Sequence, residues 1–156
     1  MSAVEDRLAA LGLTLPAVPA PVAAYQPAVV DGERVWTSGQ LPFVEGALPV
    51  TGKVGEGEGL VPPERAAQMA RIAALNALAA VKSVVGDLDR VAQVVKVVAF
   101  VASAPGFTGQ PAVANGASEL LGAVLGDAGR HARSAVGVAC LPMDAPVEVE
   151  LVVAFR

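Results

Sequence analysis

The segment Val91 to Ala102 restricts the fold of this chain more than any other feature of the sequence. Valine dominates it, and only Gln93 and Lys96 interrupt its apolar character. β-Branched side chains favour extended backbone, but a strand with one face in water would alternate apolar and polar residues. We therefore expect a strand covered on both faces, by helices of its own chain and by another copy of the chain, which makes the protein a homo-oligomer.

Two long helices can cover the first of these faces. Pro62-Pro63-Glu64 opens one of them, because proline is tolerated at the first helical position and an acidic residue suits the positive end of a helix. This helix is expected to continue to about Val85 and to end at Gly86. The other is expected from Pro111 to Leu125, with one apolar stripe along its length.

Further strands complete the expected sheet. Val29-Val30 and Arg34 to Thr37 flank an Asp31-Gly32 turn signal and predict a hairpin. Ala132 to Leu141 and Val147 to Phe155 flank a proline-bounded turn and predict a terminal antiparallel pair. The sequence thus predicts an α+β fold, a mixed sheet with two main helices packed on one face.

The start of the chain differs in character from the rest. Val4 to Leu11 has helical spacing of its apolar residues and predicts a short helix, with Leu11 on its apolar side. Prolines between Pro16 and Pro27 then favour an extended strap over the surface. We expect residues 1–24 to form this helix and strap and residues 25–156 to form a single domain.

Composition excludes several classes of protein. The chain has 156 residues, of which 54% are apolar and 17% charged, which favours one folded domain over disorder. Its long uncharged stretches contain prolines, which argues against a membrane-spanning helix. The first residues include Glu5, Asp6 and Arg7 in place of a basic start and an apolar leader, so a cytoplasmic location is expected.

Metal and nucleic-acid chemistry find little support in the composition. Cys140 and His131 are the single cysteine and the single histidine, so neither an internal disulfide nor a structural zinc site is expected, and His131 is interpreted as a surface group. The net charge of −4 and the aromatic content of 4% argue against a nucleic-acid partner, which would need a basic face or stacking platforms.

The most informative stretch surrounds Arg133. Strand alternation places Arg133, Ala135 and Gly137 on one face, so a long cation stands among side chains too small to fill the space beside it. A guanidinium in an open pocket would bind a carboxylate through two hydrogen bonds. The residues leave a second interpretation open, in which Arg133 forms a structural ion pair with Glu148 or Glu150.

Other candidate site residues also have two interpretations. Glu148 and Glu150 share one face of the last strand, either as ordinary exposed residues or as a carboxylate that orients water or accepts a proton. Ser38-Gly39 forms either a bulge or a wall that a ligand can approach closely. Asn115 is expected to hydrogen-bond from helix to strand, as is Asn76, while Tyr25 either packs its ring on the surface or offers its hydroxyl to a ligand.

Several segments taken in order point to a known family. They are Tyr25, Ser38-Gly39-Gln40-Leu41-Pro42, Ala66-Ala67-Gln68, Asn76, Val97 to Val101, Ala132-Arg133-Ser134, Leu141-Pro142 and Val147-Glu148-Val149-Glu150. With these segments the chain resembles the Rid (YjgF-like) reactive intermediate deaminases over most of Tyr25 to Phe155. The ordered combination is far more specific than any one segment.

The resemblance implies a chorismate-mutase-like α+β fold, a homotrimer and three clefts between neighbouring subunits. It also implies that Arg133 binds the substrate carboxylate and that Glu148 positions a water for attack on an imine. The leading hypothesis built on these roles needs no cofactor. The expected lining of the cleft consists of Ser38, Gly39 and the backbone of Ala135, with Tyr25 and Asn115 at its rim.

Two positions depart from the family pattern. Ala135 stands where family deaminases commonly carry cysteine, and Ala24 stands where a proline often precedes the residue that matches Tyr25. Because the cysteine position is thought to contribute mainly through its backbone, Ala135 is compatible with the chemistry and bears on the substrate range.

A simple hairpin of the last two strands would separate the two expected catalytic residues. Glu148 would then lie opposite Cys140, about 23 Å from Arg133 at ~3.3 Å per residue. We therefore expect that Arg133 and Glu148 come from different subunits or that these strands are not simply paired.

The leading functional hypothesis is hydrolytic deamination of small 2-imino or enamino acids to 2-oxo acids and ammonia. One alternative is a module that binds a small carboxylate in the same cleft without turnover. Another is endoribonuclease activity, which some members of the family have been assigned.

Overall fold

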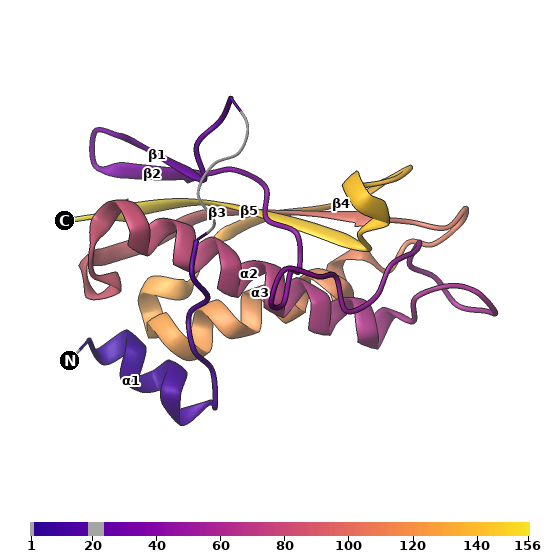
Figure 1. Ribbon diagram of the computed structural model, residues 1–156, viewed down its shortest axis with the longest axis horizontal. Helices are drawn as coiled ribbons and strands as arrows, with labels where there is room; N and C mark the ends of the chain where they lie inside the picture. The colour runs from indigo at the N-terminus through magenta and orange to yellow at the C-terminus, as the bar shows by residue number, and fades with distance from the viewer. Residues whose placement is uncertain (1, 19–23) are drawn as a thin grey trace.

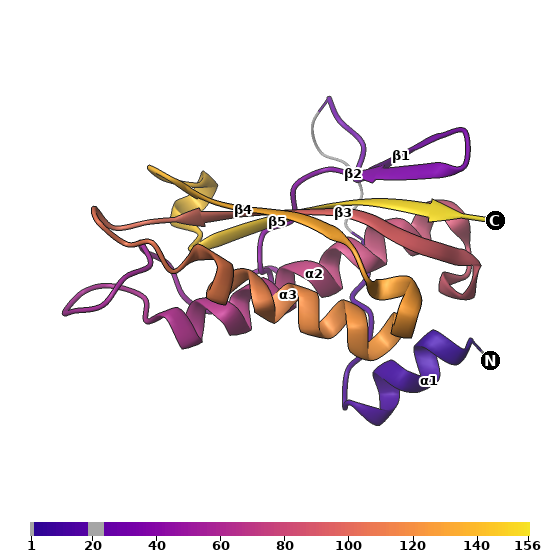
Figure 2. The same cartoon turned by 180° about the vertical axis from the view of Figure 1, so that it is seen from behind.

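The computed structural model describes residues 2–18 and 24–156 of the chain. The five strands found in this part form one mixed sheet in the order β1-β2-β5-β3-β4. They are β1 (Ala28–Asp31), β2 (Arg34–Thr37), β3 (Val91–Ala102), β4 (Ala132–Val138) and β5 (Val147–Phe155). Helices α2 (Pro63–Val85) and α3 (Gln110–Leu125) lie side by side on one face of the sheet (Figures 1 and 2), which confirms the predicted fold class.

The ends of both long helices follow from local sequence signals. Gly86 follows α2 with φ 85°, and Gly126 follows α3 with φ 62°, both in the left-handed region that glycine tolerates. The two helices approach closely at Gly116, where an added Cβ would lie 1.9 Å from the backbone oxygen of Ala67. Glycine at this position therefore sets the spacing of the helical layer.

The β1–β2 hairpin forms as predicted, but its turn is one residue later than expected. Asp31 pairs with Arg34, so Gly32 and Glu33 form the loop, with Gly32 at φ 58°. Strand β2 then pairs antiparallel with β5 through Val35 and Val153, which are both fully buried. The hairpin thereby extends the sheet on the side of β5.

The predicted terminal antiparallel pair is wrong. Strands β4 and β5 do not pair with one another, because β3 lies between them, parallel to β4 and antiparallel to β5. β3, α3 and β4 form a strand–helix–strand unit, and such a crossover connects parallel strands. The apolar strand β3 gains a neighbour on each edge in this arrangement.

Strand β3 is covered on one face by its own chain. Val97, Ala99 and Val101 face the helices and are buried, with Val97 and Val101 fully inaccessible. Val98 and Phe100 point to the opposite face and remain half-buried. Cover for this second face by another copy of the chain remains a prediction.

Helix α1 (Ala3–Ala10) packs beneath α3 and the short 3-10 turn η1 (Leu88–Arg90), on the far side of the helical layer from the sheet (Figure 1). Val4 and Leu8 are buried there, whereas Leu11, which was expected on the same apolar side, is 43% exposed. Of the predicted proline strap, Pro19 and Pro21 lie outside the described residues.

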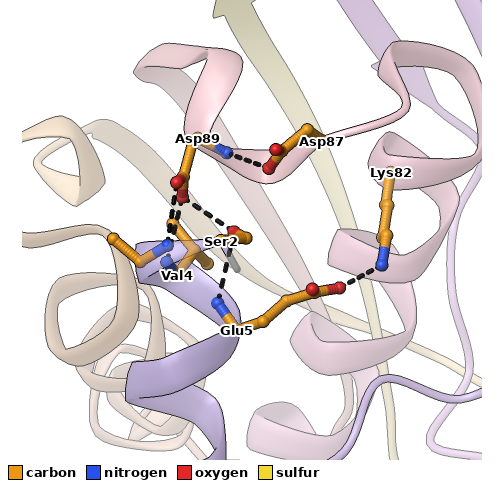
Figure 3. Close-up of polar contacts among 7 residues, drawn as sticks. Ser2, Val4, Glu5, Lys82, Asp87 and Asp89 are labelled. Carbon is orange, nitrogen blue, oxygen red and sulfur yellow. Dashed lines mark hydrogen bonds and ion pairs between the residues drawn. The ribbon is translucent and has the colours of Figure 1, made fainter.

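Polar contacts fix the start of α1 (Figure 3). The Asp89 carboxylate accepts hydrogen bonds from the backbone amides of Ala3 and Val4 and from the Ser2 hydroxyl, at 2.8 to 3.0 Å. The Val4 amide, followed by the Ala3 amide and the Ser2 hydroxyl, holds the pKa of Asp89 below its ordinary value. Glu5 of α1 also forms an ion pair with Lys82 of α2.

Across residues 2–18 and 24–156, no helix combines the length and the apolar character that crossing a membrane requires.

Candidate functional site

Arg133 lies on the edge strand β4 and its side chain is held against α3. Its Cα pairs with that of Val97, which is buried beneath the helices. The Arg133 side chain therefore extends from the face of the sheet that carries the helices. Its Nη1 donates to Asn115 Oδ1 at 2.8 Å and to Ser118 Oγ at 3.1 Å. The predicted helix-to-strand hydrogen bond of Asn115 is therefore formed, with Arg133 as its donor.

The positive charge of Arg133 has no acidic partner within the described part of the chain. The ion pairs found there join Glu5 to Lys82 and Asp127 to Arg130. The alternative interpretation, an ion pair with Glu148 or Glu150, is not realised in the single chain. The charge of the guanidinium remains available to an anion.

Small residues continue the strand beyond Arg133, as predicted. Ala135 pairs with Ala99 and Gly137 with Val101, so both lie on the same side as Arg133. A Cβ on Gly137 would lie 2.8 Å from Gln110 Nε2, which shows how close this end of the strand is to the start of α3.

Glu148 belongs to the central strand β5 and points to the opposite face of the sheet. It lies between the buried residues Val147 and Val149 and pairs with Phe100. Burial, followed by the negative charge of Glu150, raises the pKa of the Glu148 carboxyl above its ordinary value. A carboxyl in such surroundings is better suited to accept a proton than a fully exposed one.

Gly39 lies directly against the Glu148 carboxyl. A Cβ at position 39 would lie 1.8 Å from Glu148 Oε1, so a larger residue would displace the carboxylate. Backbone hydrogen bonds in both directions between Gln40 and Val149, at 2.8 and 3.0 Å, fix this approach. The neighbour at this close approach is a side chain of the same chain, and a role of Gly39 in ligand binding stays a prediction.

Ser38, the residue before Gly39, is bound to the segment that follows Tyr25. Ser38 Oγ donates to the carbonyl of Gln26 at 2.6 Å, and Ser38 N donates to the carbonyl of Pro27 at 2.8 Å. These contacts tie the segment after β2 to the segment before β1. Tyr25, next to Gln26, is 60% exposed and so presents its ring to the surface.

The predicted site residues therefore form two groups within one chain. Arg133, Ala135 and Asn115 lie on the helix side of β4, and Gly39 and Glu148 lie on the open face over β5. Two strand spacings and the offset in register separate the Cα atoms of Arg133 and Glu148 by about 14 Å. The two expected catalytic side chains point away from each other in the single chain.

Two further residues of the first group were not identified as site residues from the sequence. Ser118 Oγ lies 2.8 Å from His131 Nε2, and His131 Nδ1 lies 2.6 Å from the carbonyl oxygen of Gly129. His131 is half-buried and both of its ring nitrogens are hydrogen-bonded, so it is more enclosed than the surface position expected for it. The spacing of His131 two residues before Arg133, just ahead of strand β4, was the available signal, but the helix that supplies Ser118 could not be placed from spacing.

Asn76 serves a structural purpose. Its Nδ2 donates to the carbonyls of Leu41 and Phe43, at 2.9 and 3.1 Å, and so holds the segment after Gly39 to helix α2. A neighbouring cavity of about 500 Å³ is lined by Asn76, Gln40 and Phe43 together with Pro16 to Val18. Neither Arg133 nor Glu148 lines this cavity.

Comparisons with known proteins agree with this architecture. The sequence model described as "YjgF/chorismate mutase-like, putative endoribonuclease" matches residues 5–155. Protein TCP17 of Trypanosoma cruzi is 44% identical over 151 residues, which are 96% of this chain and 92% of that protein. The solved structure of Atu1372 from Agrobacterium tumefaciens, described as a protein with unknown function, is 43% identical with a TM-score of 0.90, covering 99% of this chain and 93% of that one.

A second solved structure is described as a "putative endoribonuclease" from Shewanella oneidensis. It is 32% identical with a TM-score of 0.91, covering 97% of this chain and 99% of that one. The resemblance seen in the sequence is thus confirmed at the level of the family and of the chorismate-mutase-like fold. This chain belongs to the YjgF/chorismate-mutase-like family.

Proposed function

We propose that the protein hydrolyses small 2-imino or enamino acids to 2-oxo acids and ammonia, with Arg133 as the carboxylate-binding residue. The observation that carries the proposal is the state of the Arg133 guanidinium, which neutral Asn115 and Ser118 hold by one nitrogen and which no acidic residue in the described segments neutralises. Its Nε and Nη2 edge matches the two oxygens of a carboxylate.

The reaction itself needs a water and a proton acceptor. Glu148 would accept a proton from the water while the oxygen attacks the C=N carbon, forming a C–O bond and moving the π electrons to nitrogen. Return of that proton to nitrogen gives a tetrahedral intermediate with one hydroxyl and one amino group. Transfer of the hydroxyl proton to the amino group, by way of Glu148, then lets the C=O bond form as the C–N bond breaks, which releases ammonia and leaves the 2-oxo acid. The raised pKa of Glu148 suits this exchange of protons, and Arg133 would contribute by holding the substrate in place.

The separation of Arg133 and Glu148 supports a site shared between copies of the chain. The open face of the sheet carries Trp36 and Val136, which are 51% and 43% exposed, beside the half-buried Val98 and Phe100. Large apolar side chains left exposed together on one face are typical of an interaction surface. We place Arg133 of one subunit opposite Glu148 of its neighbour, in a homotrimer with three such clefts.

The test is an assay in which an amino-acid oxidase generates 2-iminobutanoate in the presence of semicarbazide. The intact protein should hydrolyse the imine before semicarbazide traps it and so reduce semicarbazone formation. Arg133→Ala should abolish this effect, whereas Arg65→Ala, which removes an exposed arginine from α2, should retain it. Absence of any effect from the intact protein would refute deaminase activity on this substrate.

Two alternatives can be tested with the same variants. Stabilisation by a small 2-oxo acid without imine hydrolysis would indicate a binding module. Endoribonuclease activity is named in the family description, and RNA cleavage that depends on Arg133 would support it. The net charge of −4 argues against RNA as the substrate.

A further inference from the structure

Behind Arg133, a chain of hydrogen bonds leads away from the expected substrate side. It passes from Arg133 Nη1 to Ser118 Oγ at 3.1 Å, from Ser118 Oγ to His131 Nε2 at 2.8 Å, and from His131 Nδ1 to the carbonyl of Gly129 at 2.6 Å. All three side chains are half-buried, so water competes less with these bonds than it would at the surface.

When the His131 imidazole is neutral, the donors and acceptors of this hydrogen-bond chain run in a single direction. The Gly129 carbonyl can only accept, so His131 Nδ1 carries a hydrogen, and Nε2 then presents a lone pair. The Ser118 hydroxyl therefore donates to Nε2, which leaves its oxygen lone pairs to accept from the Arg133 guanidinium. Each group thus donates or accepts a hydrogen bond as its neighbour requires.

The Gly129 carbonyl, at the end of this hydrogen-bond chain, is held in place by packing. Gly129 closes the 3-10 turn η2 (Gly126–Gly129), which directly follows α3, and it is buried. A Cβ at position 129 would lie 2.3 Å from the backbone oxygen of Leu121, so this turn is packed tightly against the last part of α3. The helix that supplies Ser118 and the carbonyl that orients His131 thus belong to one packed unit.

The two acceptors on α3 use the hydrogens of a single guanidinium nitrogen. Asn115 and Ser118 lie one helical turn apart and both accept from Nη1. This arrangement fixes the guanidinium plane and leaves the Nε and Nη2 edge for a carboxylate. With Asn115 alone, the group could rotate about one hydrogen bond.

We propose that Ser118 and His131 are positioning residues that hold the Arg133 guanidinium ready for a substrate carboxylate. This inference rests on the proposed function for the identity of the ligand. It adds that Ser118 contacts the guanidinium directly, whereas His131 acts through Ser118 by keeping the hydroxyl oriented.

The test compares Ser118→Ala with the matched variant Ser83→Ala, which removes an exposed serine hydroxyl from α2. Affinity is measured for 2-oxobutanoate and for its uncharged amide. Ser118→Ala should weaken binding of the acid by about tenfold, the scale of one hydrogen bond to a charged group, and should leave binding of the amide within about twofold. Ser83→Ala should change neither.

A second variant and a crystal structure complete the test. His131→Phe should weaken acid binding in the same selective way, and His131→Gln, which retains an oxygen acceptor, should weaken it less. The crystal structure of Ser118→Ala should show the guanidinium displaced from its position in the intact protein. Equal losses for acid and amide, or unchanged acid binding in both Ser118→Ala and His131→Phe, would overturn the inference.

Failure of the proposed function gives a different pattern. The intact protein would then bind neither 2-oxobutanoate nor its amide and would not hydrolyse the imine. The position of the guanidinium in crystals of Ser118→Ala would still decide the inference: a displaced group would support positioning by Ser118, and an unmoved group would overturn it.

Discussion

Glu148 illustrates how one residue is tuned by its place on the sheet. Its neighbours in sequence, Val147 and Val149, are fully buried, and its carboxyl is packed over Gly39 and near Glu150. Each of these surroundings disfavours the ionised form, because burial removes water and Glu150 adds a like charge. The same surroundings that support a role in proton transfer therefore lower the stability of the fold when Glu148 is ionised.

This balance predicts a pH-dependent gain in stability for Glu148→Gln. The folded-state pKa of Glu148 is raised above the ordinary value of 4.5, so the stability contributed by the protonated form is present below that pH and is lost as pH rises through the folded pKa. Glutamine keeps the shape without the charge. Thermal unfolding should show Glu148→Gln more stable than the intact protein at pH 7, by about 0.5 kcal/mol, the scale usual for partly exposed sites.

The stability gained by Glu148→Gln should shrink as the pH is lowered below 4.5, where the intact protein and the variant both carry a neutral side chain at position 148. A gain of equal size at pH 7 and pH 3.5 would show that charge is not its cause. The variant should also lose imine hydrolysis at every pH if Glu148 handles the proton of the attacking water.

Gly39→Ala tests whether the position of the Glu148 carboxyl matters. The added Cβ would lie 1.8 Å from Oε1, and the flexible carboxyl can move away, so the fold should survive. Displacement of a proton acceptor by about 1 Å should reduce kcat/KM by about 100-fold. Steady-state kinetics together with thermal unfolding check this expectation; unchanged kinetics in a folded variant would contradict a role for Glu148.

At the level of elements, two glycines of α3 form a matched pair. An added Cβ at Gly116 would lie 1.9 Å from the backbone oxygen of Ala67, which cannot rotate away, whereas an added Cβ at Gly122 would meet no atom within 4 Å. Gly116→Ala should therefore destabilise the protein by about 3 kcal/mol through overpacking. Gly122→Ala should stabilise it by about 0.5 to 1 kcal/mol, because alanine favours the helix.

Urea unfolding of both variants provides the measurement. Equal effects at the two positions would mean that the α2–α3 spacing adjusts without cost, contrary to the close approach at Gly116.

The docking of α1 should depend on the ionisation of Asp89. Its carboxylate accepts from the amides of Ala3 and Val4, which depresses its pKa, so the stability it contributes is present above its ordinary value of 3.8 and is lost as pH falls through the folded pKa. Asp89→Asn should lower the unfolding temperature at pH 7, and the difference should narrow at acidic pH. Hydrogen exchange at pH 7 should be faster in the amides of α1.

Asp127→Asn is the control for this experiment, because Asp127 is almost fully exposed and pairs with Arg130, three residues further along the chain. A similar acceleration of α1 exchange in both variants would indicate a general effect of charge and not the contact at the start of α1.

The elements that the sequence predicts best are those with strong local signals. The expected bounds of β3 and β5 agree with the structure, and α2 ends at Val85 as the glycine after it indicates. Pairing of β4 with β5 was wrongly expected because the two strands are neighbours in sequence. The alternating order β3, α3, β4 is the signal for a parallel pair, whereas the short proline-bounded turn between β4 and β5 favours an antiparallel hairpin.

The candidate site shows a similar division. Arg133 and Gly39 could be identified from the sequence because each signal lies within a few residues of the chain. The signals are a cation among small residues and a glycine after a strand. Contacts of Arg133 with Asn115 and Ser118 depend on the angle at which α3 crosses β4, which spacing along the chain does not contain. The hydrogen bond of His131 could not be foreseen for the same reason, since its partner Ser118 lies on that helix.

At the level of the whole molecule, the residues of the proposed site lie on the two sides of one sheet in the single chain. Arg133 belongs to the edge strand β4, and Glu148 belongs to β5 and points to the other face of the sheet. Figure 2 shows β4 at the edge of the sheet and both long helices on one face only. Association that covers the open face with the edge of a neighbour would bury apolar surface and also bring Arg133 and Glu148 together. Activity would then require assembly.

Mixing two inactive variants tests this arrangement directly. Arg133→Ala and Glu148→Gln should each lack imine hydrolysis when purified alone. If each site combines Arg133 of one subunit with Glu148 of the next, trimers reassembled from an equal mixture should recover about a quarter of the intact activity, because random assortment pairs two intact halves at that frequency. If one chain supplies both residues, every mixed site contains a defect and no activity returns. The control is the same denaturation and reassembly applied to each variant alone, and recovery in those samples would indicate residual activity in place of complementation between subunits.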